Sequence, residues 1–142
     1  MKTIIGEPIV PGQAAGQCLI SGDALSFWGG VDPETGEIID RHHSLSGRTV
    51  TQRVLVVPHG RGSCSGSGVF LEAIRNQTAP AAILVLRSDP IFALGSILGE
   101  LLYARPVPVI RLDADDHQAL SDGDQVEITA DGTVTIREPR LA

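Results

Sequence analysis

Three short apolar runs, separated by two segments with helical spacing, occupy the middle of the chain. The runs span residues Val54–Val57, 81–86 and 107–112, and their length and branched side chains predict buried strands. Between them, residues 67–76 and 91–104 place apolar side chains three and four positions apart, which predicts helices. This alternation of strand and helix predicts a parallel sheet with right-handed crossovers.

The segments on either side of this unit are rich in β-strand signals. Residues 3–5 and 17–20 predict short strands around a turn region of prolines and glycines at 8–16. Near the other end, residues 125–129 and 133–137 alternate with period two around an Asp-Gly turn, which predicts a hairpin. The sequence therefore predicts one α/β domain over residues 1–142, with a βαβαβ core, flanking β-rich segments and a C-terminal hairpin.

Local signals add detail to these elements. Ser65 or Ser67 is expected to cap the first helix, and Asp89 with Pro90 the second. The apolar positions of the second helix surround most of its circumference, so we expect it to pack on more than one side. Pro106 and Pro108 stand at the start of the third strand and predict that it begins at a sheet edge.

Composition and charge exclude several classes of protein. The chain has 142 residues, a net charge of −6 and no cluster of basic residues, so nucleic acid and anionic membranes are poor candidate partners. No window is long and apolar enough to span a membrane, and the first residues lack the pattern of a signal peptide. Two cysteines, Cys18 and Cys64, form no disulfide framework, which favours a reducing, cytoplasmic compartment.

A glycine- and serine-rich loop joins the first strand of the unit to its first helix. It presents backbone N–H groups and the positive end of a helix, which together favour an anion. Three interpretations remain open: a tight connection with capping serines, a dinucleotide site with Asp89 as the ribose-binding acid, or a reactive hydroxyl. The loop reads Gly60-Arg61-Gly62-Ser63-Cys64-Ser65-Gly66-Ser67.

The third interpretation gives Ser63 the role of a base. Its alkoxide would be stabilised by the loop N–H groups, the helix end and the cation of Arg61. The same field would hold a substrate carboxylate. This arrangement suits removal of a proton next to a carboxyl group, because negative charge accumulates on that group as the proton leaves.

Two segments carry a resemblance to a known family. The first runs from Phe27-Trp28-Gly29-Gly30 through Asp32-Pro33-Glu34-Thr35-Gly36 to Asp40, and the second is the glycine-rich loop. Together with Thr78-Ala79-Pro80 they resemble the small subunit of aconitase X, over nearly the whole chain. The resemblance implies a swivelling β/β/α domain that completes the active site of a large subunit. It also implies that an iron–sulfur cluster lies in that large subunit, with no cofactor and no metal site in this chain.

The resemblance further implies dehydration of a small hydroxy acid. Ser63 matches the base of the family, and Arg61, Gly62 and Ser65 are the expected substrate contacts. Ser65 stands where aconitase swivel domains usually carry an arginine, so the anion contact shifts to Arg61, the loop N–H groups or the partner. The loop resembles the bacterial type, which implies cis-3-hydroxy-L-proline as substrate. Phosphomevalonate is the alternative, and a nucleotide-binding or regulatory module that uses the Gly60–Gly66 loop is the alternative from another class.

The sequence assigns less specific roles to the remaining polar residues. His42 and His43 are adjacent and would face opposite ways in a strand, so a loop role is favoured over a metal site. His59 beside the loop could tune Ser63 or close the turn. The acidic residues from 113 to 116 predict a solvated loop, with a divalent-ion site as the alternative.

Overall fold

The computed structural model describes residues 2–61 and 65–137. Its strands form one eight-stranded sheet in the order β1-β8-β7-β3-β4-β5-β6-β2. Strands β3 to β6 run parallel to one another, and the other neighbours pair antiparallel. The elements are β1 (Lys2–Ile5), β2 (Glu7–Val10), β3 (Ala14–Ile20), β4 (Val54–Val57), α1 (Ser65–Arg75), β5 (Ala82–Val85), α2 (Pro90–Tyr103), β6 (Val109–Arg111), α3 (Ala114–Gln118), β7 (Gln125–Ile128) and β8 (Thr133–Arg137).

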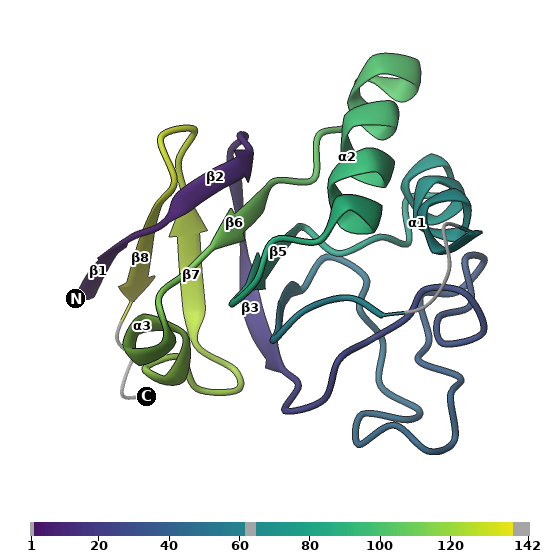
Figure 1. The fold of residues 1–142 in the computed structure, drawn as a ribbon, viewed down its shortest axis with the longest axis horizontal. Coiled ribbons are helices and arrows are strands. Elements are labelled where there is room, and N and C mark those ends of the chain that lie inside the picture. The colour runs from purple at the N-terminus through teal and green to yellow at the C-terminus, as the bar shows by residue number, and fades with distance from the viewer. Residues whose placement is uncertain (1, 62–64, 138–142) are drawn as a thin grey trace.

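The sheet curls round on itself. Strands β1 and β2 stand at opposite ends of the strand order, yet only Gly6 separates them in sequence. They form one bent segment that pairs with β8 before the bend and with β6 after it, as Figure 1 shows. Gly6 N–H donates to the carbonyl of Gly132 in the hairpin turn at 3.0 Å, and a side chain at Gly6 would collide with Ile110. The bend therefore depends on a residue without a Cβ.

Two hydrophobic cores result, one on each side of the central strands. Val54 and Val56 of β4 point into a core enclosed by the curled sheet, whereas Leu55 and Val57 point toward the helices. Residues of β5 alternate in the same way. Continuous apolar runs in the sequence are thus explained, because both faces of these strands are buried. The two β layers and the helical layer confirm the expected swivelling β/β/α fold.

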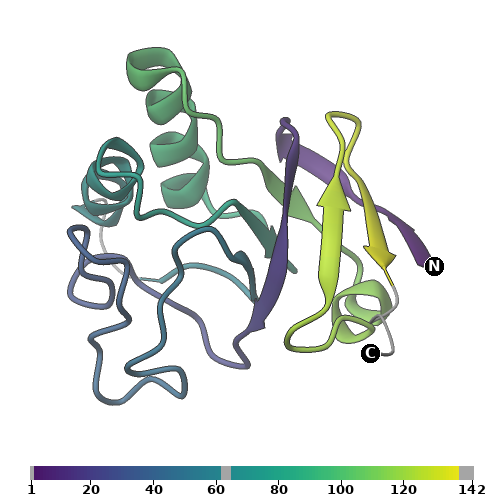
Figure 2. The same ribbon diagram turned by 180° about the vertical axis from the view of Figure 1, so that it is seen from behind.

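Helices α1 and α2 lie together on one side of the sheet, and the long loop before β4 lies beneath α1 (Figures 1 and 2). The two helices approach closely where α2 has glycine. A Cβ built on Gly95 would lie 2.7 Å from the ring of Phe70, and one on Gly99 would lie 2.7 Å from Ile74. Asp89 caps α2, since its carboxylate accepts hydrogen bonds from the N–H groups of Ile91 and Phe92, as expected.

Several sequence predictions are wrong in detail. Residues Glu7–Val10 form β2 although the sequence predicts that the turn region begins at Pro8. The strand tolerates this proline through a shift in register between Pro8 and Val10. The third strand of the unit, β6, is not at an edge, since β2 covers its outer side. Pro106 and Pro108 precede the paired residues, so no ladder bond is lost there.

Three further expectations need correction. Ser67 is the third residue of α1 rather than its cap, and Ser65 is already helical. The acidic residues after β6 form the short helix α3 instead of a loop. Helix α2 is packed on one side by the described residues, and the rest of its apolar surface is exposed.

Candidate functional site

The predicted site lies at the carboxyl edge of the parallel strands. Strand β4 ends at Val57, and the chain continues through Pro58 to Arg61 toward the start of α1 at Ser65. Gly60 pairs with Leu25, which follows β3, and the N–H of Arg61 donates to the Leu25 carbonyl at 3.3 Å. This edge is where parallel α/β sheets bind their ligands.

Two of the four predicted site residues are described, and both are accessible. Arg61 has 56% of its side chain exposed, and Ser65 is exposed at the first described turn of α1. Gly62 and Ser63, the proposed anion contact and the proposed base, lie outside the described residues, as does Cys64. The base assignment therefore stays a prediction, as does the contact of Arg61 and Ser65 with substrate.

Asp40 holds the guanidinium of Arg61. Their Oδ2 and Nη2 atoms are 3.0 Å apart, and the Asp40 side chain is only 20% exposed. Its other oxygen accepts the N–H of His42 at 3.0 Å. The hydrogen bond from His42 and then the nearby charge of Arg61 lower the pKa of the Asp40 carboxyl. The carboxylate is thus charged at neutral pH, and it fixes the position of the one cation expected to meet substrate.

The long loop that carries Asp40 is anchored at both ends. Phe27 stacks on Phe70 with ring centroids 4.8 Å apart and meets the edge of Phe92 at 5.8 Å. Further along, buried His43 accepts the N–H of Leu45 at Nδ1, so its Nε2 carries the proton that faces Ser21 Oγ at 3.2 Å. The same loop therefore has an aromatic anchor against both helices and a polar anchor beside β3.

The sequence predicts that His43 lies in a loop, but it does not predict that His43 is buried. The sequence also gave no spacing signal for Asp40, which lies 21 residues before Arg61. Asp40 closes the first segment that carries the family resemblance, and that was its only signal. Trp28 follows Phe27 and exposes 61% of its surface.

The Asp89 side chain has a structural role. Its carboxylate caps α2, and a Cβ built on Gly60 would lie 2.7 Å from Asp89 Oδ2. Gly60 therefore makes room for this carboxylate and for Phe92. Asp89 Oδ1 accepts both capping hydrogen bonds, and Oδ2 lies against Gly60. A ribose-binding acid needs both oxygens free for hydroxyl groups, so the use of Oδ1 as a cap does not favour the dinucleotide interpretation.

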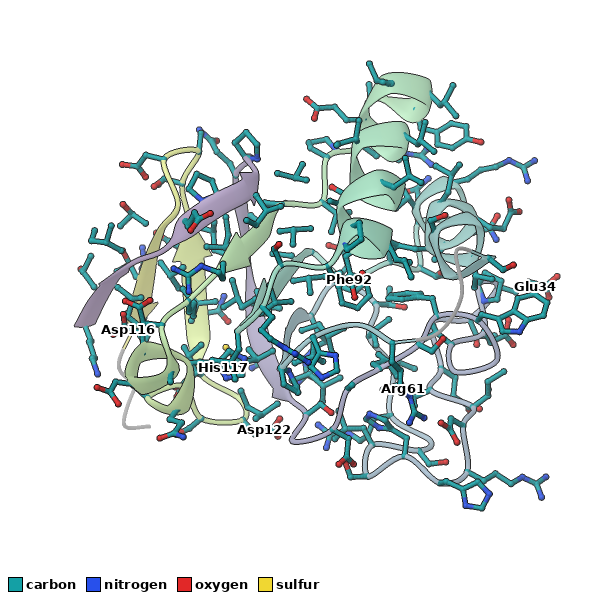
Figure 3. The ribbon with its side chains drawn as sticks, in the orientation of Figure 1. Glu34, Arg61, Phe92, Asp116, His117 and Asp122 are labelled. Carbon is teal, nitrogen blue, oxygen red and sulfur yellow. The ribbon has the colours of Figure 1, made fainter. Side chains whose placement is uncertain are left out.

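Two histidines lie near the end of β4. His59 Nδ1 lies 2.5 Å from the carbonyl oxygen of Gly60. His117 of α3 donates from Nε2 to the Val57 carbonyl at 3.0 Å if that nitrogen carries the proton. Figure 3 places His117 on the side of α3, away from Arg61. His59 thus engages its own turn, which agrees with the turn-closing alternative.

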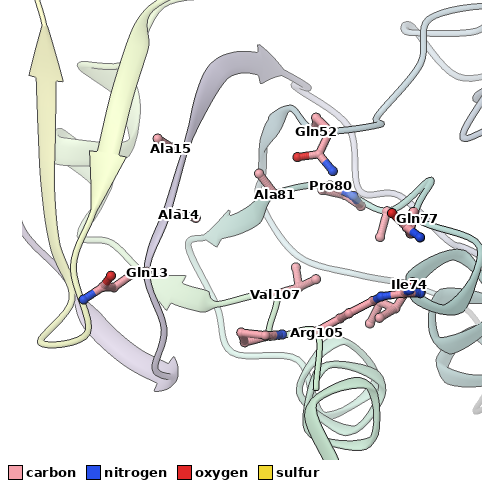
Figure 4. Close-up of a pocket in the computed structure, with 12 residues that line it drawn as sticks. Gln13, Ala14, Ala15, Gln52, Ile74, Gln77, Pro80, Ala81, Arg105 and Val107 are labelled. Carbon is pink, nitrogen blue, oxygen red and sulfur yellow. Dashed lines mark hydrogen bonds between the residues drawn. The ribbon is translucent and has the colours of Figure 1, made fainter. Parts of the chain in front are cut away.

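A pocket of about 330 Å³ lies at the opposite edge of the sheet (Figure 4). Gln52, Ala81 and Val107, which precede β4, β5 and β6, contribute to its lining. Arg105 also lines it, and its guanidinium donates to the carbonyls of Ile74 and Arg75 at the end of α1. The pocket is therefore remote from the glycine-rich loop and from the predicted chemistry.

Within residues 2–61 and 65–137, no group of three or more His, Cys, Asp or Glu side chains is placed to hold a metal ion. Cys18 is buried among apolar side chains, and burial raises the pKa of its thiol to about 12, with Asp124 and Asp122 adding to the effect. None of the helices in the described part of the chain could cross a membrane.

The comparisons with known proteins agree with this geometry. A family model described as the aconitase X swivel domain matches residues 3–136. A cis-3-hydroxy-L-proline dehydratase of Pseudomonas aeruginosa is 52% identical over 75% of this chain, but the chain spans only 18% of that protein's length. A phosphomevalonate dehydratase small subunit of Methanosarcina mazei is 43% identical over 85% of this chain and 81% of the relative.

A solved structure supports the same assignment. The crystal structure of Thermococcus kodakaraensis aconitase X in its holo-form contains a chain that superposes with a TM-score of 0.86 and 36% identity. The match covers 97% of this chain and all of that chain. Sequence and fold lead to one conclusion: the chain belongs to the aconitase X swivel domain family.

Proposed function

We propose that this chain is the small subunit of a hydro-lyase that dehydrates a hydroxy acid, with cis-3-hydroxy-L-proline as its substrate. The observation that carries the proposal is the glycine-rich loop of this family, set before α1 at the carboxyl edge and beside an anchored, exposed arginine. The 52% identity with a Pseudomonas aeruginosa protein of that name supports the choice of substrate.

In this proposal Ser63 removes the proton next to the substrate carboxylate. The N–H groups of Gly62 and Ser65, the start of α1 and the Arg61 guanidinium would hold the carboxylate. As the proton leaves, charge grows on that carboxylate, so these contacts strengthen in the transition state. Loss of the proton and of the hydroxyl group removes one water and gives an enamine, which tautomerises to pyrroline-2-carboxylate.

The proposal also requires a larger polypeptide. That partner would carry the iron–sulfur cluster, which supplies the Lewis acid for the departing hydroxyl group. This chain contributes its loop, and Asp40 positions Arg61 before substrate arrives. Two cysteines, one of them buried Cys18, fit a reducing, cytoplasmic compartment.

Two alternatives compete with this proposal, one with another substrate and one with another class of protein. The similarity to a phosphomevalonate dehydratase small subunit, over 81% of that protein, favours phosphomevalonate. The glycine-rich loop alone favours a nucleotide-binding or regulatory module, although Asp89 is engaged as a helix cap. Neither alternative changes the expected fold or the position of the loop.

Reconstitution with the larger aconitase X polypeptide of the same organism separates these possibilities. We expect turnover of cis-3-hydroxy-L-proline only with both chains present, measured anaerobically as formation of pyrroline-2-carboxylate. Ser63→Ala should abolish it, while Ser121→Ala, at an exposed serine in the turn before β7, serves as a matched control. Turnover of phosphomevalonate instead would replace the substrate, and tight nucleotide binding by the lone chain that Asp89→Ala abolishes would replace the class of protein.

A further inference from the structure

Helix α2 exposes its large aliphatic side chains and buries its small residues. Most of the residues it buries are small: Gly95, Ser96 and Gly99, together with Phe92. At about 100° per residue, four exposed side chains fall within an arc of about 140° on the opposite side. We call them the outer face of α2: Leu94, Ile97, Leu101 and Leu102, with exposures of 47%, 45%, 74% and 60%.

The outer face is not needed to hold α2 in this chain. Gly95 and Gly99 let the helix approach Phe70 and Ile74 of α1, and Ser96 donates a hydrogen bond to the carbonyl of Val107. The upper half of α2 also stands clear of the sheet in Figures 1 and 2. An exposed aliphatic stripe of this kind on a well-packed helix is a typical protein interaction surface.

We propose that the outer face of α2 docks on the larger polypeptide of the dehydratase. The inference rests on the proposed function, which requires that polypeptide to receive the glycine-rich loop. The start of α2 lies beside the start of α1, since a Cβ built on Gly66 would lie 3.3 Å from Ile91. Leu94 is one turn further along. A partner that covers the loop therefore meets the beginning of the outer face.

The relatives indicate why this contact should be permanent and apolar. The segment that matches this chain forms 18% of a longer chain in the Pseudomonas aeruginosa relative, whereas a separate small subunit of similar length occurs in Methanosarcina mazei. In both arrangements the same domain has to stay with a larger partner. Permanent interfaces are more hydrophobic than transient ones and resemble a divided protein core. An aliphatic helix face about 12 Å long, from Leu94 to Leu102, suits such an interface better than a brief encounter.

The test compares two equally exposed aliphatic residues. Leu101→Glu introduces a charge on the outer face, and Ile5→Glu introduces the same charge on β1, where Ile5 is 72% exposed. Association of each variant with the larger polypeptide is measured by biolayer interferometry, and circular dichroism checks that both variants fold. We expect Leu101→Glu to raise Kd about 30-fold or more, as hot-spot residues do, and Ile5→Glu to change it less than about twofold.

The outcomes separate this inference from the proposed function. Equal Kd values for Leu101→Glu and the unchanged chain would overturn the docking surface, as would self-association of this chain that Leu101→Glu abolishes without affecting the larger partner. A complex that forms normally, depends on Leu101 and dehydrates neither substrate would refute the proposed function and support the docking surface.

Discussion

Because α1 packs closely against α2, we predict that Gly95→Ala destabilises the chain. Helix propensity alone would predict the opposite effect on stability. Replacing glycine by alanine inside a helix normally stabilises it by about 1 kcal/mol. At Gly95 the new methyl group would lie 2.7 Å from the ring of Phe70 and 3.2 Å from the Ser67 carbonyl oxygen. Phe70 is fully buried and contacts the rings of Phe27 and Phe92, so a shift of its ring would disturb both contacts.

The magnitude follows from these two opposing effects. Overpacking a core of this kind costs about 1–3 kcal/mol, which outweighs the propensity gain of about 1 kcal/mol. We expect Gly95→Ala to lower the free energy of unfolding by up to about 2 kcal/mol. For a chain of this length that corresponds to a Tm lower by up to about 8 °C. Circular dichroism melts and urea titration of the isolated chain measure both quantities.

Gly68 is the matched control. It lies inside α1, is exposed, and has no atom within 4 Å of a built Cβ. Gly68→Ala should therefore gain the propensity term alone and raise the free energy of unfolding by about 1 kcal/mol. If Gly95→Ala stabilises the chain as much as Gly68→Ala does, the two helices are not limited by contact at Gly95 and the packing argument is wrong.

Other residues give shorter predictions. In the reconstituted enzyme, Asp40→Asn should raise KM about two- to five-fold with little change in kcat, because the half-exposed Arg61 guanidinium loses its ion-pair partner; an unchanged KM would contradict this. His43→Ala should cost about 1–3 kcal/mol in urea titration, because it removes a buried hydrogen-bond partner, whereas exposed His42→Ala should cost little. Burial raises the pKa of Cys18 in the folded chain to about 12, above the ordinary thiol value of 9.0. The contribution of this thiol to the free energy of unfolding is thus fully present below pH 9. Above pH 9 it falls by at most about 1.4 kcal/mol per pH unit, and Cys18→Ala should flatten that slope.

The elements that the sequence predicts well are those with strong local signals. Strand β4 has the predicted bounds because all four of its residues are apolar and buried on both faces. Helix α2 begins at Pro90 because the side chain of Asp89, the preceding residue, caps the N–H groups two and three residues further along. In both cases neighbouring residues alone contain the information.

The features that sequence reasoning missed depend on distant partners. Strand β2 exists because β6, a hundred residues later, offers it a free edge, and Pro8 alone points to a turn. The apolar circumference of α2 suggested burial on several sides, but Gly95 and Gly99 decide which side meets α1. Asp40 meets Arg61 across 21 residues of sequence, on a long loop that packs on α1 through Phe27. Such pairings follow from tertiary structure and leave no periodic pattern.

The bent segment at Gly6 has a consequence for synthesis of the chain. Lys2 pairs with Ile136, so β1 leaves the ribosome well before β8, and the backbone hydrogen bonds between them form only once β8 has followed. The parallel unit from β4 to β6 can assemble earlier, because its strands lie closer together in sequence. The enclosed side of the sheet is then the final part to be completed, and the early strands stay available for wrong pairing until the hairpin emerges.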